Sequence, residues 1–245
     1  MTTAATRSLQ DEIARRADIG KPLSLWLRDD DAIEPTAALN HLLALTATHS
    51  VPVLLAVIPS LTGEALSGRL AGESHASVAV HGWAHKNHAS SGEKNQELGA
   101  HRPEDQVLAE LGAGLETLIT LHAGRFVPML VPPWNRIAPA VVAGLPGLGF
   151  EVLSVFGPEK PAPLKVLNTH VDIIDWRGTR GGRPTEAVIA DLIRVSQLHD
   201  GPIGLLTHHL VHDGAAWNLM EMIFEATAAQ SGCSWRSAGD LLRNG

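Results

Sequence analysis

The chain alternates between short apolar runs rich in Val, Ile and Leu and longer stretches in which apolar residues recur at helical spacing. The short runs predict buried strands, and the longer stretches predict helices with one apolar face. The predicted strands span residues 23–27, 51–57, 77–80, 126–131, 151–154, 171–174 and 203–206. The predicted helices span residues 36–48, 62–70, 104–122, 139–144, 185–198 and 215–230.

This alternation predicts an α/β fold with a parallel sheet. About seven strand and helix units in a chain of 245 residues favour a single irregular (β/α) barrel, a fold that commonly needs about 250 residues. An open doubly wound sheet is disfavoured because no glycine-rich fingerprint follows the first strand. Residues 1–20 predict a loosely packed helical appendage without chemistry, and residues 21–245 predict one barrel domain.

Composition narrows the classes of partner. Hydrophobic residues make up 44% of the chain and charged residues 18%, which is enough apolar material for a core. The net charge of −7 and the lack of any basic block argue against nucleic acid. Apolar runs such as 51–58 are far shorter than the ~20 residues that span a bilayer, and no cationic segment followed by an apolar one opens the chain. We therefore expect a cytoplasmic protein with no membrane partner. Whether it forms a homo-oligomer stays open.

Carboxylates gather after the first predicted strand, where Arg28 is followed by Asp29, Asp30 and Asp31. In a barrel, this end of the strands is the catalytic face. Three adjacent like charges repel one another and normally need a cation or a strong donor beside them. The cluster therefore predicts a metal or acid/base site, against the alternative of an Asp-rich turn that caps the next helix.

Histidines gather after the third predicted strand. The chain has 13 histidines but a single cysteine, Cys233, so a cysteine-based metal cluster and an intrachain disulfide are excluded. His81 and His85 would lie on one face, about 5–6 Å apart, if the segment turned helical, and could then bind one ion. His88 is a third candidate. An Asp and two imidazoles leave positions for water, as in a catalytic site, whereas the alternative is a solvated loop.

Three later strand ends also carry polar or aromatic residues. After residues 126–131, two prolines would present Trp134 as a rigid wall near Arg136, or would merely connect a strand to a helix. Asp172 and Asp175 follow at the next site, where either could orient a catalytic group or begin a turn. His208 and His209 end the last strand, and since adjacent residues point in opposite directions, one of them should face the site.

Together these segments, from about residue 22 to 213, resemble the polysaccharide deacetylase family, carbohydrate esterase family 4. The resemblance implies an irregular (β/α) barrel and metal-dependent amide hydrolysis. In the RDDD segment it implies Asp30 as general base and Asp31 as metal ligand, with a shift to Asp29 and Asp30 left open. The HGWAH segment is the most specific match, and it implies His81 and His85 as metal ligands.

The remaining motifs match less completely. Pro133 and Trp134 fit the third motif, but Val131 stands where the family has an arginine, so Arg136 or Arg28 would have to replace it. The candidate substrate-binding residues are Pro133, Trp134, Arg136, Trp176 and His209.

The last two motifs concern the acetyl pocket and proton transfer. The fourth, which pairs an aspartate with a tryptophan of the acetyl pocket, corresponds to Asp175 and Trp176. The fifth implies His208 as the catalytic acid, with His209 as the fallback. We expect Asp175 or Asp172 to hold that imidazole in its donor tautomer.

The expected function is hydrolysis of a non-peptide C–N bond, first of all N-deacetylation of an acetylated sugar or glycan by a metal-activated water. Zn²⁺ is the first choice of ion, and Co²⁺, Ni²⁺ and Mn²⁺ suit the same ligands. One alternative is a cytoplasmic amidohydrolase of a small cyclic amide or ureide. Another is a non-catalytic carbohydrate- or metal-binding relic, for which the missing arginine is the best argument.

Overall fold

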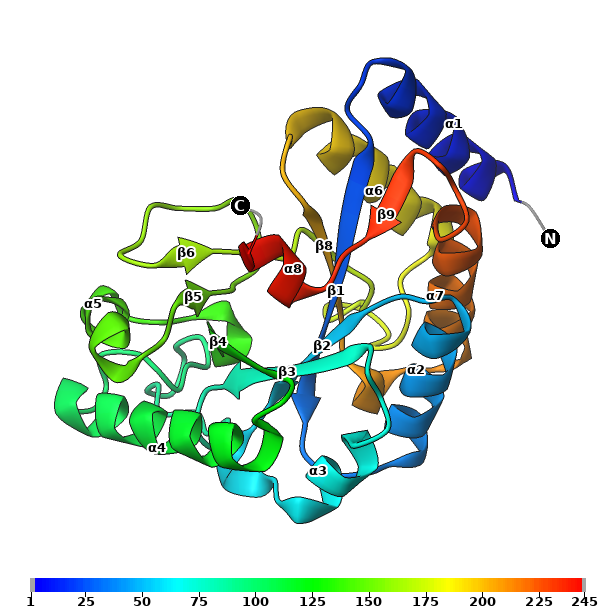
Figure 1. The fold of residues 1–245 in the computed structure, drawn as a ribbon. Coiled ribbons are helices and arrows are strands. Elements are labelled where there is room, and N and C mark those ends of the chain that lie inside the picture. Colours follow the sequence, from blue (N-terminus) through cyan, green and yellow to red (C-terminus); the bar gives the residue numbers. More distant parts are fainter. Residues whose placement is uncertain (1–2, 244–245) are drawn as a thin grey trace. The chain divides into compact units, whose positions relative to one another are not determined.

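The computed structural model describes residues 3–243 and is drawn in Figure 1. Residues 1–2 of the predicted appendage and residues 244–245 of the predicted barrel domain lie outside this range. In chain order, the α-helices and strands of the described part are α1 (Ala4–Asp18), β1 (Leu23–Ala32), α2 (Ala37–Thr48), β2 (Val53–Val57), α3 (Glu64–Leu70), β3 (Ala76–His81), α4 (Glu104–His122), β4 (Phe126–Val131), α5 (Pro139–Leu148), β5 (Val152–Leu153), β6 (Lys165–Val166), β7 (Val171–Asp172), α6 (Thr185–Leu198), β8 (Ile203–Thr207), α7 (Gly214–Thr227), β9 (Cys233–Trp235) and α8 (Ala238–Arg243). Three single-turn 3₁₀ helices, η1 (Pro59–Leu61), η2 (Pro133–Asn135) and η3 (His209–Val211), follow β2, β4 and β8.

The chain divides into two compact units. Unit 1 comprises Met1–Asp29, Thr36–Leu54 and Thr169–Gly245, and unit 2 comprises Asp30–Pro35 and Leu55–Asn168. In unit 1, β1 pairs in parallel with both β8 and β9, and β8 pairs in parallel with β7. In unit 2, the strands β3, β4, β5 and β6 pair in that order, and all of these pairs are parallel.

The seven predicted strands and six predicted helices are all present, as the apolar pattern indicates. About seven strands are expected, whereas residues 3–243 form nine, because β6 and β9 contain no apolar run. β1 is longer than expected: it continues through the acidic run to Ala32 instead of ending at residue 27. An apolar pattern cannot detect that continuation, since the added residues are charged.

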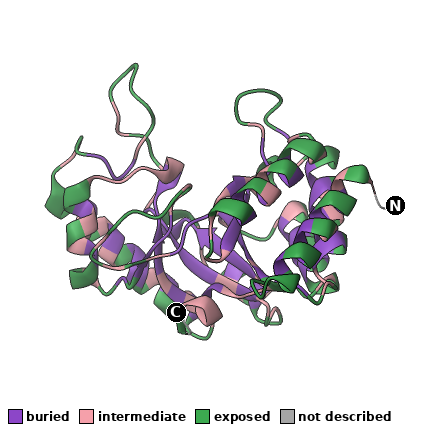
Figure 2. Ribbon diagram, turned by 90° about the horizontal axis from the view of Figure 1, so that it is seen from above, coloured by how far each residue is buried: buried purple, intermediate pink, exposed green. Residues whose placement is uncertain are grey.

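The longer strands are largely buried, while the outer sides of the helices are exposed (Figure 2). Every residue of β2 is buried, and so is every residue of β8. Such continuous burial explains why these strands read as unbroken apolar runs. Among the described helices, none combines the length and the apolar character that crossing a membrane would require.

The N-terminal helix packs more tightly than the sequence suggests. α1 begins with a capping box between Thr3 and Thr6 and packs against α6 and α7 of the same unit (Figure 1). Leu9 and Ile13 are buried, and the Arg16 guanidinium donates to the backbone carbonyl of Ser196. The expected loose packing is therefore wrong, because a short apolar stripe among charged residues is enough to bury one face. The boundary of a separate appendage at residue 20 stays a prediction.

The buried His122 imidazole, at the end of α4, should make the free energy of unfolding depend on pH. Its side chain is buried, neither ring nitrogen has a hydrogen-bond partner, and burial together with the Arg125 charge lowers its pKa to about 4. Between pH 6.5 and 4, the unfolded chain binds a proton that the folded chain does not, so the free energy of unfolding falls as the pH falls. The free energy of unfolding should fall between pH 7 and pH 5 by about 2 kcal/mol less in His122→Leu than in the wild type, as measured by urea unfolding. Equal losses in the two proteins would contradict this assignment.

Candidate metal centre

Three side chains of unit 2 converge on one point. They are Asp31 near the end of β1, His81 at the end of β3 and His85 in the loop that follows β3. One Asp31 carboxylate oxygen, Oδ1, lies 3.0 Å from Nε2 of His81 and 3.2 Å from Nε2 of His85. The three candidate ligand atoms all lie within 4.8 Å of one another. One carboxylate oxygen and two imidazole nitrogens at this separation match the ligand types of a zinc-like ion.

Strand register orients the His81 ring. His81 pairs with Val131 of β4, and its Nδ1 lies 2.9 Å from the Val131 carbonyl oxygen. If Nδ1 carries the proton that this carbonyl accepts, Nε2 directs its lone pair at the Asp31 carboxylate. A proton or a metal ion between these two atoms relieves the repulsion. Val131, which stands where the third motif has an arginine, thus orients the predicted ligand His81 through its backbone carbonyl.

The backbone at this site occupies the left-handed region. The φ angle is 72° at Asp31, 60° at Gly82 and 53° at His85. Such angles are uncommon for residues other than glycine, and they concentrate at functional sites. The segment after β3 does not turn helical: residues 82–88 form an irregular loop. A loop can bring the two imidazoles together, with ring centroids 5.1 Å apart, without helical spacing.

The two imidazoles differ in their electrostatics. Burial by itself lowers the pKa of His81, but the hydrogen bond to Asp31 and the charges of Asp30 and Asp31 outweigh it, so this pKa is raised. The pKa of His85 is lowered by burial and by the neighbouring His81, against the opposing charges of Asp31 and Glu97. A metal ion requires neutral imidazoles, so metal affinity in such a cluster increases with pH. Asp30, the predicted base, is buried in β1.

Two predicted substrate-binding residues adjoin the cluster within unit 2. The Trp134 ring lies 4.3 Å from the His85 ring, measured between centroids, and Trp134 has a φ of 54°. Pro133 is buried and lies against Gly82, because a Cβ added to that glycine would come within 2.6 Å of the proline Cγ. Arg136 donates to the Asn95 carbonyl oxygen at 2.7 Å.

Unit 1 contains the other predicted site residues. His208 follows β8, and its ring meets the Trp176 ring edge-on, with centroids 4.7 Å apart. Trp176 donates from Nε1 to the Asp172 carboxylate at 2.8 Å and is 40% exposed. Asp175 closes a turn, since its carboxylate accepts from the backbone N–H groups of Gly178 at 3.0 Å and Thr179 at 3.3 Å.

Asp29 and His209 form a pair at the end of β1 and β8. The Asp29 carboxylate accepts from the His209 backbone N–H at 2.8 Å and lies 2.5 Å from His209 Nδ1. Neither side chain is exposed. Arg28, the candidate replacement for the missing arginine, is likewise fully buried and pairs with Leu206 of β8 in the strand register. Sequence reasoning missed the Asp29–His209 pair, because it depends on the register of two strands far apart in the chain.

Sequence reasoning also missed Glu97. This buried carboxylate contacts the loop that carries His85, through the backbone N–H groups of Trp83 and Ala84. Glu97 lies in a polar stretch without apolar periodicity, so no pattern in the sequence distinguishes it from a solvated residue.

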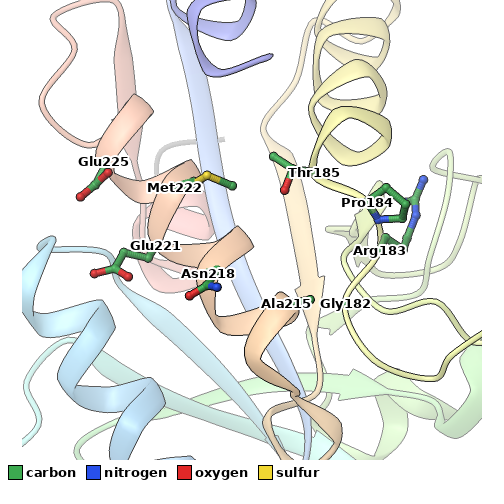
Figure 3. A pocket seen from close by; sticks show the side chains of 9 residues that line it. All are labelled: Gly182, Arg183, Pro184, Thr185, Ala215, Asn218, Glu221, Met222 and Glu225. Carbon is green, nitrogen blue, oxygen red and sulfur yellow. The ribbon is translucent and has the colours of Figure 1, made fainter. Parts of the chain in front are cut away.

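A surface pocket of about 680 Å³ lies in unit 1 (Figure 3). It is lined by the segment that leads into α6 and by the exposed side of α7, including Arg183, Asn218, Glu221 and Glu225. None of the predicted site residues is among its lining residues.

No protein-family model matches the chain, and no curated protein matches it. Several solved structures do match. A polysaccharide deacetylase from Mycobacterium smegmatis, described as putative, has a TM-score of 0.67 at 16% identity, over 91% of this chain and 90% of that one. A mutant of a carbohydrate esterase family 4 pseudoenzyme has a TM-score of 0.62 at 14% identity, over 91% of this chain and 68% of that one.

A third match holds a metal. A family 4 acetyl xylan esterase from Clostridium thermocellum, in complex with a cobalt ion, has a TM-score of 0.60 at 14% identity, over 89% of this chain and 90% of that one. Identities this low bear on the fold alone. The chain therefore has the (β/α) barrel fold of the family 4 carbohydrate esterases, the fold that its motifs predict.

Proposed function

We propose that the chain is a metal-dependent hydrolase of a non-peptide C–N bond, and that its reaction is N-deacetylation of an acetylated sugar or glycan. The observation that carries this proposal is the convergence of Asp31, His81 and His85 on one point of unit 2. A buried imidazole aimed at a carboxylate, with left-handed backbone at two of the three residues, is a costly arrangement without a ligand. The fold shared with family 4 enzymes supports the same assignment.

The proposed ligands are Asp31, His81 and His85. Three protein ligands leave positions for water and substrate, and a divalent ion bound there supplies a water of lowered pKa and polarises the scissile carbonyl. Zn²⁺ is the first candidate on ligand chemistry, and Co²⁺, Ni²⁺ and Mn²⁺ are acceptable to the same donors. The cobalt ion in the Clostridium thermocellum esterase supports a site of this type.

The protein's own groups would handle the protons and the substrate. We propose that Asp30 accepts a proton from the attacking water and that a backbone N–H near Pro133 stabilises the oxyanion. His208 is proposed to protonate the leaving nitrogen, with Asp175 or Asp172 orienting its ring. An apolar sugar face would stack on Trp134, which lies beside His85. Trp176, Arg136 and His209 remain further candidates for substrate contacts.

One alternative has its own support. The chain could be a carbohydrate- or metal-binding relic, since Val131 replaces the family arginine and a pseudoenzyme is among the structures that share the fold. A small cyclic amide or ureide is the other substrate class, and it would suit the predicted cytoplasmic location. The two hydrolases differ in the product released, and the relic releases none.

Chelator-treated protein supplemented with Zn²⁺ or Co²⁺ tests the proposal. We expect metal addition to raise acetate release from N-acetylated sugars and short glycans by at least about 100-fold, because metal polarisation is worth several kcal/mol. Ring opening of cyclic ureides to the corresponding acids, without acetate release from the sugars, would replace the substrate class. Stoichiometric metal binding with neither product would favour the relic.

A further inference from the structure

We propose that Glu97 is a positioning residue that holds the loop carrying His85 in its metal-binding conformation. This inference rests on the proposed function, because it concerns the geometry of the same cluster. Glu97 contacts neither Asp31 nor His81 in any hydrogen bond of the described residues. It acts through the backbone on both sides of His85.

The Glu97 carboxylate collects three backbone donors from one short loop. Its Oε2 accepts from the Trp83 N–H at 3.1 Å, and its Oε1 accepts from the Ala84 N–H at 2.7 Å and the Lys86 N–H at 3.4 Å. The side chain is only 1% exposed. Trp83 and Ala84 are half-buried and Lys86 is exposed, and in this loop neither a helix nor a sheet supplies acceptors for their N–H groups. The two oxygens of the Glu97 carboxylate supply them.

Gly82 permits this close approach. A Cβ at this position would lie 2.1 Å from Glu97 Oε2 and 2.6 Å from Pro133 Cγ. The residue also has a φ of 60°, which glycine adopts readily. Any larger residue in place of Gly82 would collide with the Glu97 carboxylate. Glycine directly after His81 therefore lets Glu97 contact this loop.

Glu97 is itself anchored to the segment that follows β4. Arg136 donates to the Asn95 carbonyl oxygen at 2.7 Å, and the Ala138 N–H donates to the Leu98 carbonyl oxygen at 2.8 Å. The same segment includes Trp134, whose ring lies against His85. Residues 95–98 thus connect the loop that carries His85 with the segment that carries Trp134. The Glu97 side chain contacts the first, and the backbone carbonyls of Asn95 and Leu98 contact the second.

These contacts explain how His85 keeps a φ of 53°. A non-glycine residue in this region persists only when its surroundings determine its conformation. If the N–H acceptor were lost, the loop could relax and move the His85 imidazole away from Asp31. Groups that orient metal ligands typically contribute about 10–100-fold to metal affinity.

The test compares Glu97→Gln with the control Glu93→Gln in the full chain. Glu93 lies in the same loop region, and its exposed carboxylate accepts from the Ser90 N–H and contacts His101. Co²⁺ is titrated into each metal-free protein, and the affinity and the visible absorption spectrum of the bound ion are recorded. We expect Glu97→Gln to weaken Co²⁺ binding about 10–100-fold and to change the spectrum, with Glu93→Gln unchanged. A merely structural role would lower the melting temperature but leave affinity and spectrum as in the wild type, and that result would overturn the proposal.

A second measurement needs no variant. In the metal-free wild type, the Trp83 and Ala84 amides should show hydrogen-exchange protection at least about tenfold above that of Ser90, which donates to an exposed carboxylate. Equal protection would also overturn the positioning role. A wild-type chain that binds no Co²⁺ would overturn the proposed function together with this inference, whereas equal Co²⁺ binding by wild type and Glu97→Gln would remove this inference alone.

Discussion

Replacing His85 with alanine is expected to reduce metal-dependent amide hydrolysis by about 10²–10³-fold while the chain remains folded. The Nε2 of His85 lies 3.2 Å from Asp31 Oδ1, and its side chain is 23% exposed, so the substitution removes a ligand atom at a modest cost in packing. Loss of one ligand should forfeit several kcal/mol of transition-state stabilisation, and 1.36 kcal/mol corresponds to tenfold in rate. The measurement is kcat/KM, together with metal stoichiometry and circular dichroism.

His88→Ala is the matched control for that experiment. His88 lies three residues further along the same loop, and it is not among the described groups that converge on Asp31. Its backbone N–H donates to the Gln96 carbonyl oxygen, a contact that alanine keeps. We expect this variant to retain wild-type activity and metal content. Full activity in His85→Ala would show that His85 is not a metal ligand. A loss of activity in both variants would show that the substitutions disturb the whole loop.

Asp29→Asn is expected to lower the free energy of unfolding by about 3 kcal/mol, because it breaks a fully buried, charge-assisted pair. The carboxylate receives the His209 backbone N–H at 2.8 Å and faces His209 Nδ1 at 2.5 Å. An asparagine amide keeps the shape but can offer only one acceptor oxygen to these two groups, and its own N–H₂ would face a donor. Urea unfolding of the wild type and the variant measures the difference.

The partner variant Asp31→Asn separates stability from metal binding. Asp31 is 29% exposed, so the exchange should change the free energy of unfolding little and weaken metal binding strongly. Asp29→Asn should do the reverse, with metal stoichiometry retained per folded molecule. Should Asp31→Asn keep the metal, Asp31 would not be the ligand. Loss of the metal in Asp30→Asn would then favour the shifted alignment, in which Asp30 is the ligand and Asp29 the base.

Much of the fold could be predicted because it depends on local signals. Burial on both sides turns parallel strands into apolar runs, so β2, β4 and β8 stand out, and α4 and α6 coincide with their predicted spans. The HGWAH segment likewise predicts a pair of imidazoles. β6 (Lys165–Val166) and β9 (Cys233–Trp235) contain no apolar run that a sequence pattern could detect.

The candidate site was less predictable, because its contacts join residues that are distant in sequence. Nothing local distinguishes Glu97 from other residues of a polar loop, and nothing in the RDDD segment indicates that Asp29 lies against His209 while Asp31 faces His81. In a regular strand, Asp29 and Asp31 would point to the same face, because they are two residues apart. At Asp31 a positive φ adds a local turn of the backbone, and only the surrounding packing determines such an angle.

By itself, the sequence determined the order of strands and helices, the apolar core and the residue types available for a metal centre. These follow from composition and periodicity, which record whether each position is buried or exposed. Only the tertiary structure decided which of three adjacent aspartates meets the imidazoles, that a loop and not a helical turn brings His85 to His81, and that Glu97 supports this loop. Those outcomes depend on strand register and on acceptors for backbone N–H groups, and both are properties of segments brought together by folding.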